Sequence, residues 1–339
     1  MAASRPSDKP DHDGKGDSDV ETSVLMPVYN AESTLGASLA SAFSQTQPPD
    51  EIIAIDDGSV DGTAAILAAC ERPGLKVFSQ ANQGLAATLN RGLGLARGRY
   101  IARLDNDDLA LPDRLERQVQ FMERHPEVAV LGAWAEIYEG NTPSGRHHRH
   151  PTENARLRLD LLFDNPFVHS SIMMRTDVIR ELGGYRVEGN RFPEDYDLWS
   201  RVAERHQVAN LPEVLAIYRE MPGSMTRTGG REILRNVVRI STRNLCKALP
   251  DATEQECAGL SALYHGIREM PAPSLLRILR LWRNAAITIG GAPSSWSTQF
   301  REGYVKTKRH LVSQYFRRIM PAGLENGLRT LKRGLVNRS

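Results

Sequence analysis

Short apolar runs alternate with amphipathic stretches in the first third of the chain. The apolar runs predict buried strands at residues 22–28, 51–59, 75–80 and 98–105. The stretches between them carry apolar residues at helical spacing and predict helices at residues 33–46, 61–71 and 84–96. This alternation of strands and helices is typical of an α/β fold with a mainly parallel sheet flanked by helices.

The alternation becomes less regular after residue 112. The pattern predicts strands or extended chain at residues 127–138, 167–175 and 207–219. It predicts helices at residues 113–125, 154–165, 176–184 and 194–206. Residues 139–153 are polar and contain His147, His148 and His150 interleaved with arginine, so we expect a surface loop here rather than a metal site.

A basic repeat begins at Arg227, and an Arg or Lys then recurs at every fourth residue up to Lys247. On a helix these residues form a single stripe. A second basic amphipathic stretch covers residues 274–289, and together they predict a basic helical C-terminal extension over residues 228–339. Three interpretations of the basic surface are open: a solvated face, peripheral contact with an anionic membrane, or a guide for a lipid-diphosphate-linked acceptor.

Charge divides the chain into an acidic front and a basic back. Residues 226–339 contain 20 Lys and Arg against 7 Asp and Glu, whereas residues 1–225 contain 23 against 34. Motifs that read nucleic acids are absent, so we expect no nucleic-acid partner. The three cysteines are widely separated and fit neither a zinc site nor a disulfide framework, which favours a cytoplasmic location. Residues 1–20 are polar and predict a disordered tail.

Three acidic clusters follow predicted strands or open a predicted helix. The sequence DNDD places Asp105, Asp107 and Asp108 directly after a strand, where like charges repel unless a cation compensates. Oxygen ligands of this kind suit Mg²⁺, but Asp is also a common turn residue. The other clusters are DDGSVDGT at residues 56–63 and PEDYDLW at residues 193–199, and each alone fits a turn or the acidic first turn of a helix.

Taken together, the clusters and their spacing resemble the family 2 glycosyltransferases, which have the GT-A fold. The resemblance starts at SVLMPVYNAESTLG and continues through IIAIDDGSVDGT, NQGLAATLNRGLGLARGRYIARLDNDD and HSSIMMRTDVIRELGGY. It ends with PEDYDLWSRV and YREMPGSMTR. It implies a catalytic domain over residues 21–227, with a nucleotide-binding part at 21–110 and an acceptor part at 111–227.

The resemblance implies which positions contact the nucleotide. Asp57, with Asp56 beside it, matches the carboxylate that contacts a uracil or thymine base. The segments that approach or cover the nucleotide contain Pro27, Tyr29, Asn30, Asn82 and Gly84. Many members carry an Arg before the Asn of the third helix, but here Leu89 precedes Asn90. Arg91 and Arg103 are possible replacements, and the sequence does not decide between them.

The resemblance also implies where the chemistry takes place. Asp105 would face the ribose and belong, with Asp107, to the motif that holds Mn²⁺ or Mg²⁺ on the diphosphate. Asp195 matches the general base, with Glu194 as its less favoured substitute. Arg219 would approach the donor phosphates or the acceptor.

These residues predict an inverting, metal-dependent glycosyltransferase. It would move a sugar from a UDP- or dTDP-sugar to a hydroxyl of a glycan or lipid-linked glycan, in the synthesis of a cell-surface polysaccharide. Two alternatives stay open at this point: a nucleotidyltransferase on a similar sheet, and a non-catalytic nucleotide-sugar-binding or partner protein. The expected location is the cytoplasm, with peripheral contact to the inner face of the membrane through the C-terminal helices.

Overall fold

The computed structural model describes residues 21–189, 191–221 and 230–319. Three predictions fall outside these residues: the disordered tail at residues 1–20, the domain boundary at Arg227, and the helical character of residues 320–339. None of the described helices is long and apolar enough to cross a membrane.

The described strands form one mixed sheet in the order β3-β2-β1-β4-β8-β6-β9-β5, with β7 beside β6. Parallel pairing joins β1 to β2 and β4, β2 to β3, and β6 to β9, whereas the other pairs are antiparallel. The α/β fold is therefore confirmed, with its parallel part concentrated in the first four strands. The strands are β1 (Thr22–Val28), β2 (Glu51–Asp56), β3 (Leu75–Ser79), β4 (Tyr100–Arg103), β5 (Leu109–Ala110), β6 (Val128–Glu139), β7 (Thr142–His148), β8 (Met173–Arg175) and β9 (Gln207–Glu220).

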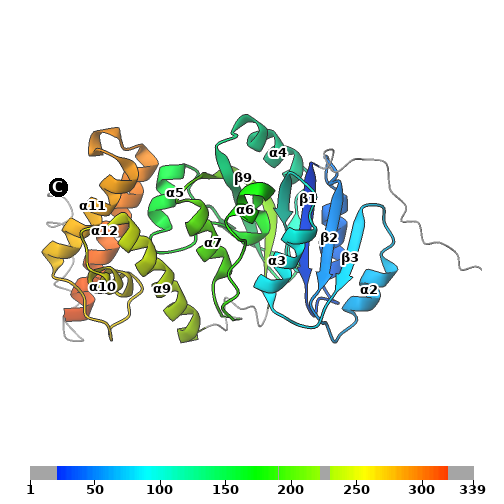
Figure 1. Cartoon of the computed structure of the whole chain (residues 1–339), viewed down its shortest axis with the longest axis horizontal. Helices are drawn as coiled ribbons and strands as arrows, with labels where there is room; N and C mark the ends of the chain where they lie inside the picture. Colours follow the sequence, from blue (N-terminus) through cyan, green and yellow to red (C-terminus); the bar gives the residue numbers. More distant parts are fainter. Residues whose placement is uncertain (1–20, 190, 222–229, 320–339) are drawn as a thin grey trace, which may run out of the picture.

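Helices cover the sheet and then form a separate layer at one end of the molecule (Figure 1). Those of the sheet region are α1 (Leu35–Phe43), α2 (Thr63–Ala69), α3 (Leu85–Leu95), α4 (Arg114–Arg124), α5 (Asn154–Asp160), α6 (Thr176–Glu181) and α7 (Glu194–Val202). Those of the C-terminal part are α9 (Gly230–Ala248), α10 (Glu254–Tyr264), α11 (Leu275–Gly290) and α12 (Thr298–Ile319). Two short 3-10 helices are η2 (His169–Ser171) and η3 (Pro293–Ser295).

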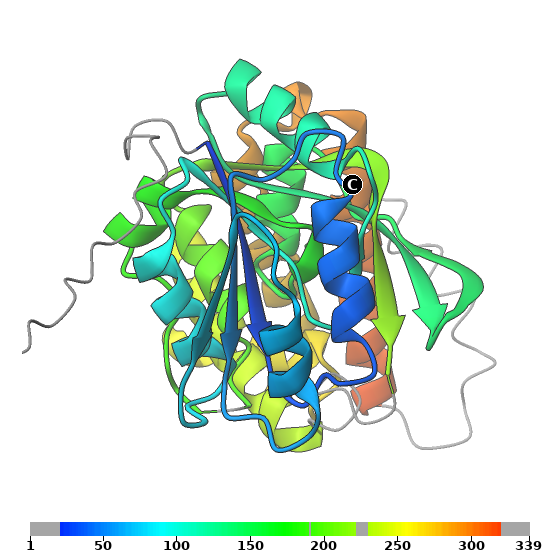
Figure 2. The ribbon, with the colours of Figure 1, turned by 90° about the vertical axis from the view of Figure 1, so that its right-hand side faces the viewer.

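The predicted loop at residues 139–153 is wrong in part, because residues 142–148 form β7 and pair with β6. Most side chains of β7 are exposed, so the strand shows no alternation of apolar and polar residues. Figure 2 shows this hairpin reaching out from the body of the sheet. A strand with both faces in solvent has no hydrophobic signature that a sequence pattern could detect.

Alternate residues of the central strands point to opposite faces and build two cores. Met26 and Ala54 belong to the core on one face, together with residues of α1 and α4. Leu25 and Ile53 belong to the core on the other face, with residues of α3 and α7. The parallel strands β1, β2 and β4 therefore have fixed registers, and the residues that follow β2 and β4 meet at the same edge of the sheet.

A third core joins the C-terminal helices to the sheet region. Trp282 and Phe300 are fully buried in it, together with Leu159, Leu162 and Phe163 from α5 and the turn after it. The helices α9 to α12 thus share a hydrophobic core with the part of the chain that precedes them.

Candidate active site

An acidic cluster follows β4 at this edge. Carboxylate oxygens of Asp105, Asp107 and Asp108 lie within 4.8 Å of one another. Asp105 has two partners: the Oγ of Ser170 donates to its Oδ2 at 2.7 Å, and Nη2 of Arg103 donates to its Oδ1 at 2.5 Å. These contacts fix Asp105 and, with the charge of Arg103, hold its pKa below the usual value despite burial.

Asp107 and Asp108 lack such compensation for their negative charge, and their pKa values are raised. Burial and the charge of Asp105 raise the pKa of Asp107 to about 6, and the same causes raise the pKa of Asp108 well above its usual value. The Oδ1 of Asp108 accepts a hydrogen bond from the backbone N of Arg219 at 2.7 Å, but its buried Oδ2 has no partner among the described residues. Three close carboxylates with one orphaned oxygen fit a hard divalent cation.

Arg103 interacts electrostatically both with this cluster and with His169. Its side chain is fully buried, and its charge contributes to the lowered pKa of His169, about 3, of which burial is the main cause. The Nε2 of His169 lies 3.1 Å from the hydroxyl oxygen of Tyr185. Both rings pack against Trp199 of α7, with ring centroids 5.9 and 6.2 Å away. Aromatic side chains thus link the end of β4 to α7.

The first turn of α7 carries Glu194 and Asp195. The Oδ2 of Asp195 accepts a hydrogen bond from Nδ2 of Asn165 at 2.7 Å, and its Oδ1 accepts one from the backbone N of Tyr196 at 2.6 Å. Asp195 is partly exposed, whereas Glu194 is only 8% exposed. The two hydrogen bonds hold the accessible carboxylate in one orientation.

The two carboxyl groups ionise at different pH values. Burial raises the pKa of Asp195 to about 6 and, with the added charge of Asp195, raises the pKa of Glu194 to about 8. The charges of Arg103 and Asp105 also contribute to the pKa of Asp195. The 3-10 helix η2 links the two groups, because Ser170 donates to Asp105 and the neighbouring His169 packs against Trp199 of α7. At neutral pH Asp195 is the ionised member of the pair.

Asp57 lies at the same edge, after β2, and organises the predicted nucleotide loop. Its Oδ1 accepts hydrogen bonds from Nε2 of Gln80 at 2.7 Å and from the backbone N of Gln83 at 2.9 Å. Its Oδ2 accepts one from the backbone N of Gly84 at 2.8 Å. The buried carboxylate therefore holds the loop that contains Asn82, a role that the sequence did not indicate.

The remaining nucleotide-side predictions lie around the turn after β2. Asp56 closes this turn by accepting a hydrogen bond from the backbone N of Ser59 at 2.9 Å. Asn30 has a φ of 48° and accepts a hydrogen bond from the backbone N of Val60 at 2.9 Å. Pro27 is buried in β1, and Tyr29 is 48% exposed. These contacts join the residues after β1 to the residues after β2.

Arg91 and Arg103 contact different parts of the site. They are the candidates to replace the Arg that many family members carry at the position of Leu89. Leu89 is fully buried. Arg91 donates hydrogen bonds to the backbone O of Ser79 at 2.9 Å and to Oε1 of Gln80 at 3.0 Å, next to the loop held by Asp57. Arg103 instead donates a hydrogen bond to Asp105 of the acidic cluster. The predicted Arg219 is 5% exposed on β9, and its charge offsets a small part of the rise in the pKa of Asp107 that burial and Asp105 cause.

Asn165 is a site residue that the sequence did not predict. Asp108 was part of the acidic cluster in the sequence, but the metal motif implied by the resemblance contained only Asp105 and Asp107. Asn165 had no signal beyond a turn before a proline, because it is 30 positions away from its partner Asp195. The histidines of residues 147–150 do not form a further metal group among the described residues.

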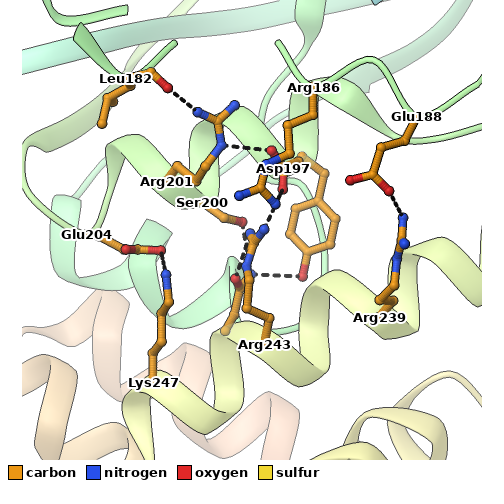
Figure 3. A network of polar contacts seen from close by, with 12 residues as sticks. Leu182, Arg186, Glu188, Asp197, Ser200, Arg201, Glu204, Arg239, Arg243 and Lys247 are labelled. Atoms are coloured by element: carbon orange, nitrogen blue, oxygen red, sulfur yellow. Dashed lines mark hydrogen bonds and ion pairs between the residues drawn. The ribbon is translucent and has the colours of Figure 1, made fainter. Parts of the chain in front are cut away.

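An ion-pair network joins α7 and its flanking residues to α9 (Figure 3). The carboxylate of Asp197 is fully buried and pairs with Nη1 of Arg186 at 3.3 Å, with Nε of Arg201 at 2.8 Å, and with Arg243 of α9. Arg239 pairs with Glu188, and Lys247 pairs with Glu204. Half of the predicted basic stripe therefore contacts acidic residues of the preceding part of the chain.

Comparisons with known proteins identify the family of the chain. The family described as "Glycosyl transferase family 2" matches residues 23–183. EpsE of Bacillus subtilis, named as a glycosyltransferase, is 39% identical over 206 residues, which are 59% of this chain and 73% of EpsE. The chain belongs to glycosyl transferase family 2. It is a glycosyltransferase, and this excludes the two alternatives of a nucleotidyltransferase and a non-catalytic binding protein.

Two further relatives of the glycosyltransferase have more specific names. The amylovoran biosynthesis glycosyltransferase AmsE of Erwinia amylovora is 34% identical and covers 64% of this chain and 83% of its own length. A UDP-Gal:alpha-D-GlcNAc-diphosphoundecaprenol beta-1,3-galactosyltransferase of Escherichia coli is 32% identical and covers 61% of this chain and 77% of its own length.

A solved structure extends the likeness to most of the chain. The structure of residues 1–349 of S. aureus TarS with UDP-GlcNAc has a TM-score of 0.58 and 17% identity, and the match covers 88% of this chain and 92% of that TarS fragment. At this identity the likeness concerns the fold alone, and it confirms the predicted GT-A architecture with helices after the catalytic domain.

Proposed function

We propose that this glycosyltransferase moves a sugar from a UDP- or dTDP-sugar to a hydroxyl of a glycan or lipid-linked glycan, with inversion and with the help of a divalent cation. The observation that carries the proposal is that η2 links the cluster of Asp105, Asp107 and Asp108 to α7, which carries the partly exposed carboxylate of Asp195. A proton acceptor and a site for a cation are the two groups that such a transfer needs.

The donor side is formed by the acidic cluster and the loops after β1 and β2. Asp105, Asp107 and Asp108 would hold Mn²⁺ or Mg²⁺, and the cation would offset the negative charge that grows on the leaving diphosphate. Arg219 is next to this cluster, because its backbone N donates to Asp108, and its side chain would approach the donor phosphates. Asp57 keeps the loop around Asn82 in place, and the ordered loop would bind the nucleotide base.

The acceptor side is formed by the first turn of α7. Asp195 accepts the proton of the acceptor hydroxyl as the oxygen attacks the anomeric carbon. Asn165 and the backbone N of Tyr196 each donate a hydrogen bond to this carboxylate and hold it in one orientation. With one base and one leaving group, the sugar is transferred in a single displacement, and no covalent bond between enzyme and sugar is required.

The names of two relatives support the proposed acceptor class. One is named for amylovoran biosynthesis and the other for a diphosphoundecaprenol-linked substrate. They support a role in polysaccharide synthesis, which we place at the cytoplasmic face of a membrane. Peripheral membrane contact through the C-terminal helices belongs to the same proposal.

A titration of UDP binding with and without Mn²⁺ tests the metal-dependent part. We expect Mn²⁺ to raise the affinity of the wild type for UDP by about tenfold or more, the effect of one charge-assisted contact. Asp107→Ala should lose this gain, because it removes a ligand. Asp113→Ala removes an equal charge from an exposed position and should keep the gain. An Asp107→Ala variant that keeps the full Mn²⁺ effect would contradict the proposed site.

A further inference from the structure

A large groove opens beside α9, outside the site described above. It has a volume of about 1380 Å³ and lies between α9, α10 and residues 265–270. In Figure 1 α9 lies between α7 and α10, and the helix contacts both. The volume exceeds that of most small-molecule pockets, which is about 300–1000 Å³.

The groove is apolar along part of its lining and basic along α9. Leu234, Val238 and Ala258 contribute apolar surface, together with Ile267 and Met270. The cationic residues that line it are Arg231, Arg235, Arg239, Arg243 and Lys247, and the acidic ones are Glu254 and Glu269. The lining therefore combines an apolar surface with an excess of positive charge, which suits an anionic group that carries an apolar chain.

Two of the cations are available to such a ligand. Arg239, Arg243 and Lys247 have carboxylate partners on α7 or next to it. Arg231 and Arg235, in the first turns of α9, have no carboxylate partner in the described part of the chain. An anion would thus bind near the N-terminal end of α9, with the apolar lining beside it.

This end of the groove adjoins the segment that leads to the proposed base. Nδ2 of Asn236 donates a hydrogen bond to the backbone O of Arg191 at 3.0 Å, and Nε of Arg191 lies 3.6 Å from Oε2 of Glu232. Residue 191 precedes Asp195 by four positions. The first turns of α9 are therefore tied to the chain that enters α7.

We propose that this groove binds the lipid-diphosphate part of the acceptor, with the diphosphate at Arg231 and Arg235 and the first part of the lipid chain on the apolar lining. The inference rests on the proposed function, because it assigns the acceptor to a lipid-linked class. It places the lipid part on the C-terminal helices and the sugar part at α7. A membrane surface is the competing explanation for the same charges, and the test separates the two.

The test measures the binding of farnesyl diphosphate, a short lipid diphosphate, to the full-length protein. Inorganic diphosphate and farnesol serve as probes of each half of the ligand. The groove variant is Arg231→Gln/Arg235→Gln, and the matched control is Arg280→Gln/Arg283→Gln, which removes the same charge from exposed positions of α11. Ala258→Phe is a second variant that fills the apolar part without changing charge.

We expect the wild type to bind farnesyl diphosphate more tightly than either half-probe. The groove variant should lose about tenfold or more in affinity, the loss expected from removing charge-assisted contacts, and Ala258→Phe should also bind more weakly. The control should bind like the wild type. All variants should keep the wild-type affinity for UDP, so that a loss of farnesyl diphosphate binding reports on the groove and not on folding.

Two results would overturn the proposal. One is farnesyl diphosphate binding that neither the groove variant nor Ala258→Phe weakens. The other is an equal loss in both double variants, accompanied by an equal loss of binding to phosphatidylglycerol vesicles, which would assign the charges to a membrane surface. Failure of the wild type to bind any UDP-sugar would contradict the proposed function instead, and the two failures are thus distinguishable.

Discussion

Glu194 and Asp195 are neighbours in sequence, but the fold gives them different surroundings. Glu194 is buried, and Asp195 is partly exposed and held by Asn165. The difference in pKa, about 8 against about 6, makes Asp195 the group that is ionised at neutral pH. A base must be ionised and reachable, and only Asp195 has both properties.

The dependence of kcat on pH should therefore show an acid limb near pH 6. Below this value Asp195 gains a proton and cannot accept another, so kcat should fall by about tenfold for each pH unit. Glu194→Gln should keep the limb near pH 6, because it leaves the base in place. A limb near pH 8 in the wild type that disappears in Glu194→Gln would identify Glu194 as the base instead. The measurement is kcat at saturating donor and acceptor over pH 5 to 9.

Single residues could be predicted from sequence where the chemistry lies in a local motif. Asp105, Asp107 and Asp195 stand in short motifs, and the structure brings them into one site. Their partners could not be predicted, because Ser170 is 65 positions from Asp105 and Asn165 is 30 positions from Asp195. Only the folded chain shows such contacts. The same holds for the three hydrogen bonds by which Asp57 fixes its loop.

At the scale of elements, α9 acts as a support for α7. Arg243 reaches from α9 to the buried carboxylate of Asp197, and Nδ2 of Asn244 donates hydrogen bonds to Oγ of Ser200 at 2.9 Å and to the backbone O of Leu161 at 2.8 Å. Asp197 lies two positions after Asp195. The orientation of the proposed base thus depends on a helix that follows the residues matched by the family.

Arg243→Gln should therefore affect both stability and catalysis. Removing one guanidinium from the buried carboxylate should lower the free energy of unfolding by about 1.5–3 kcal/mol, the usual range for a hydrogen bond to a charged group. It should lower kcat because α7 loses a contact that orients it. Thermal unfolding and transfer rates check the two effects.

Lys247→Gln provides the matched comparison. Its partner Glu204 is partly exposed, and an exposed ion pair contributes about 0–1 kcal/mol. We expect near-normal unfolding and kcat for this variant. If Arg243→Gln and Lys247→Gln behaved alike, α9 would have no special role in orienting α7.

Hydrophobic periodicity predicted most elements and failed where a segment has no buried face. The strands β1, β2 and β4 and the helix α9 follow their patterns closely. The strand β7 could not be predicted, because most of its side chains are exposed. The pattern also could not show that Arg239, Arg243 and Lys247 contact the catalytic part, since a stripe of charges gives no information about its partner.

At the scale of the whole molecule, the separation of charge along the chain has a structural use. Basic residues of the C-terminal part contact acidic residues of the preceding part in α7 or next to it, where Arg239, Arg243 and Lys247 each pair with a carboxylate. The shared core around Trp282 joins the same two regions. The charge asymmetry therefore serves in part to join the C-terminal helices to the catalytic part, and Arg231 and Arg235 are the groove cations that we assign to a ligand.

Donor binding and proton removal involve different elements in the proposed mechanism. The strands β1, β2 and β4 end at one edge of the sheet, where the loop held by Asp57 and the acidic cluster follow. Asp195 belongs to α7 instead. We therefore propose that the donor binds at the strand ends and that α7 supplies the base. The two functions should then be separable by substitution.

The most direct test of this claim is the rate of sugar transfer by Asp195→Asn, measured together with its affinity for UDP in the presence of Mn²⁺. We predict that kcat falls by about 10²–10⁴-fold, the contribution of a general base, while the Kd for UDP stays within about twofold of the wild-type value. Transfer at the wild-type rate, or a loss of UDP binding as large as the loss of transfer, would contradict this claim.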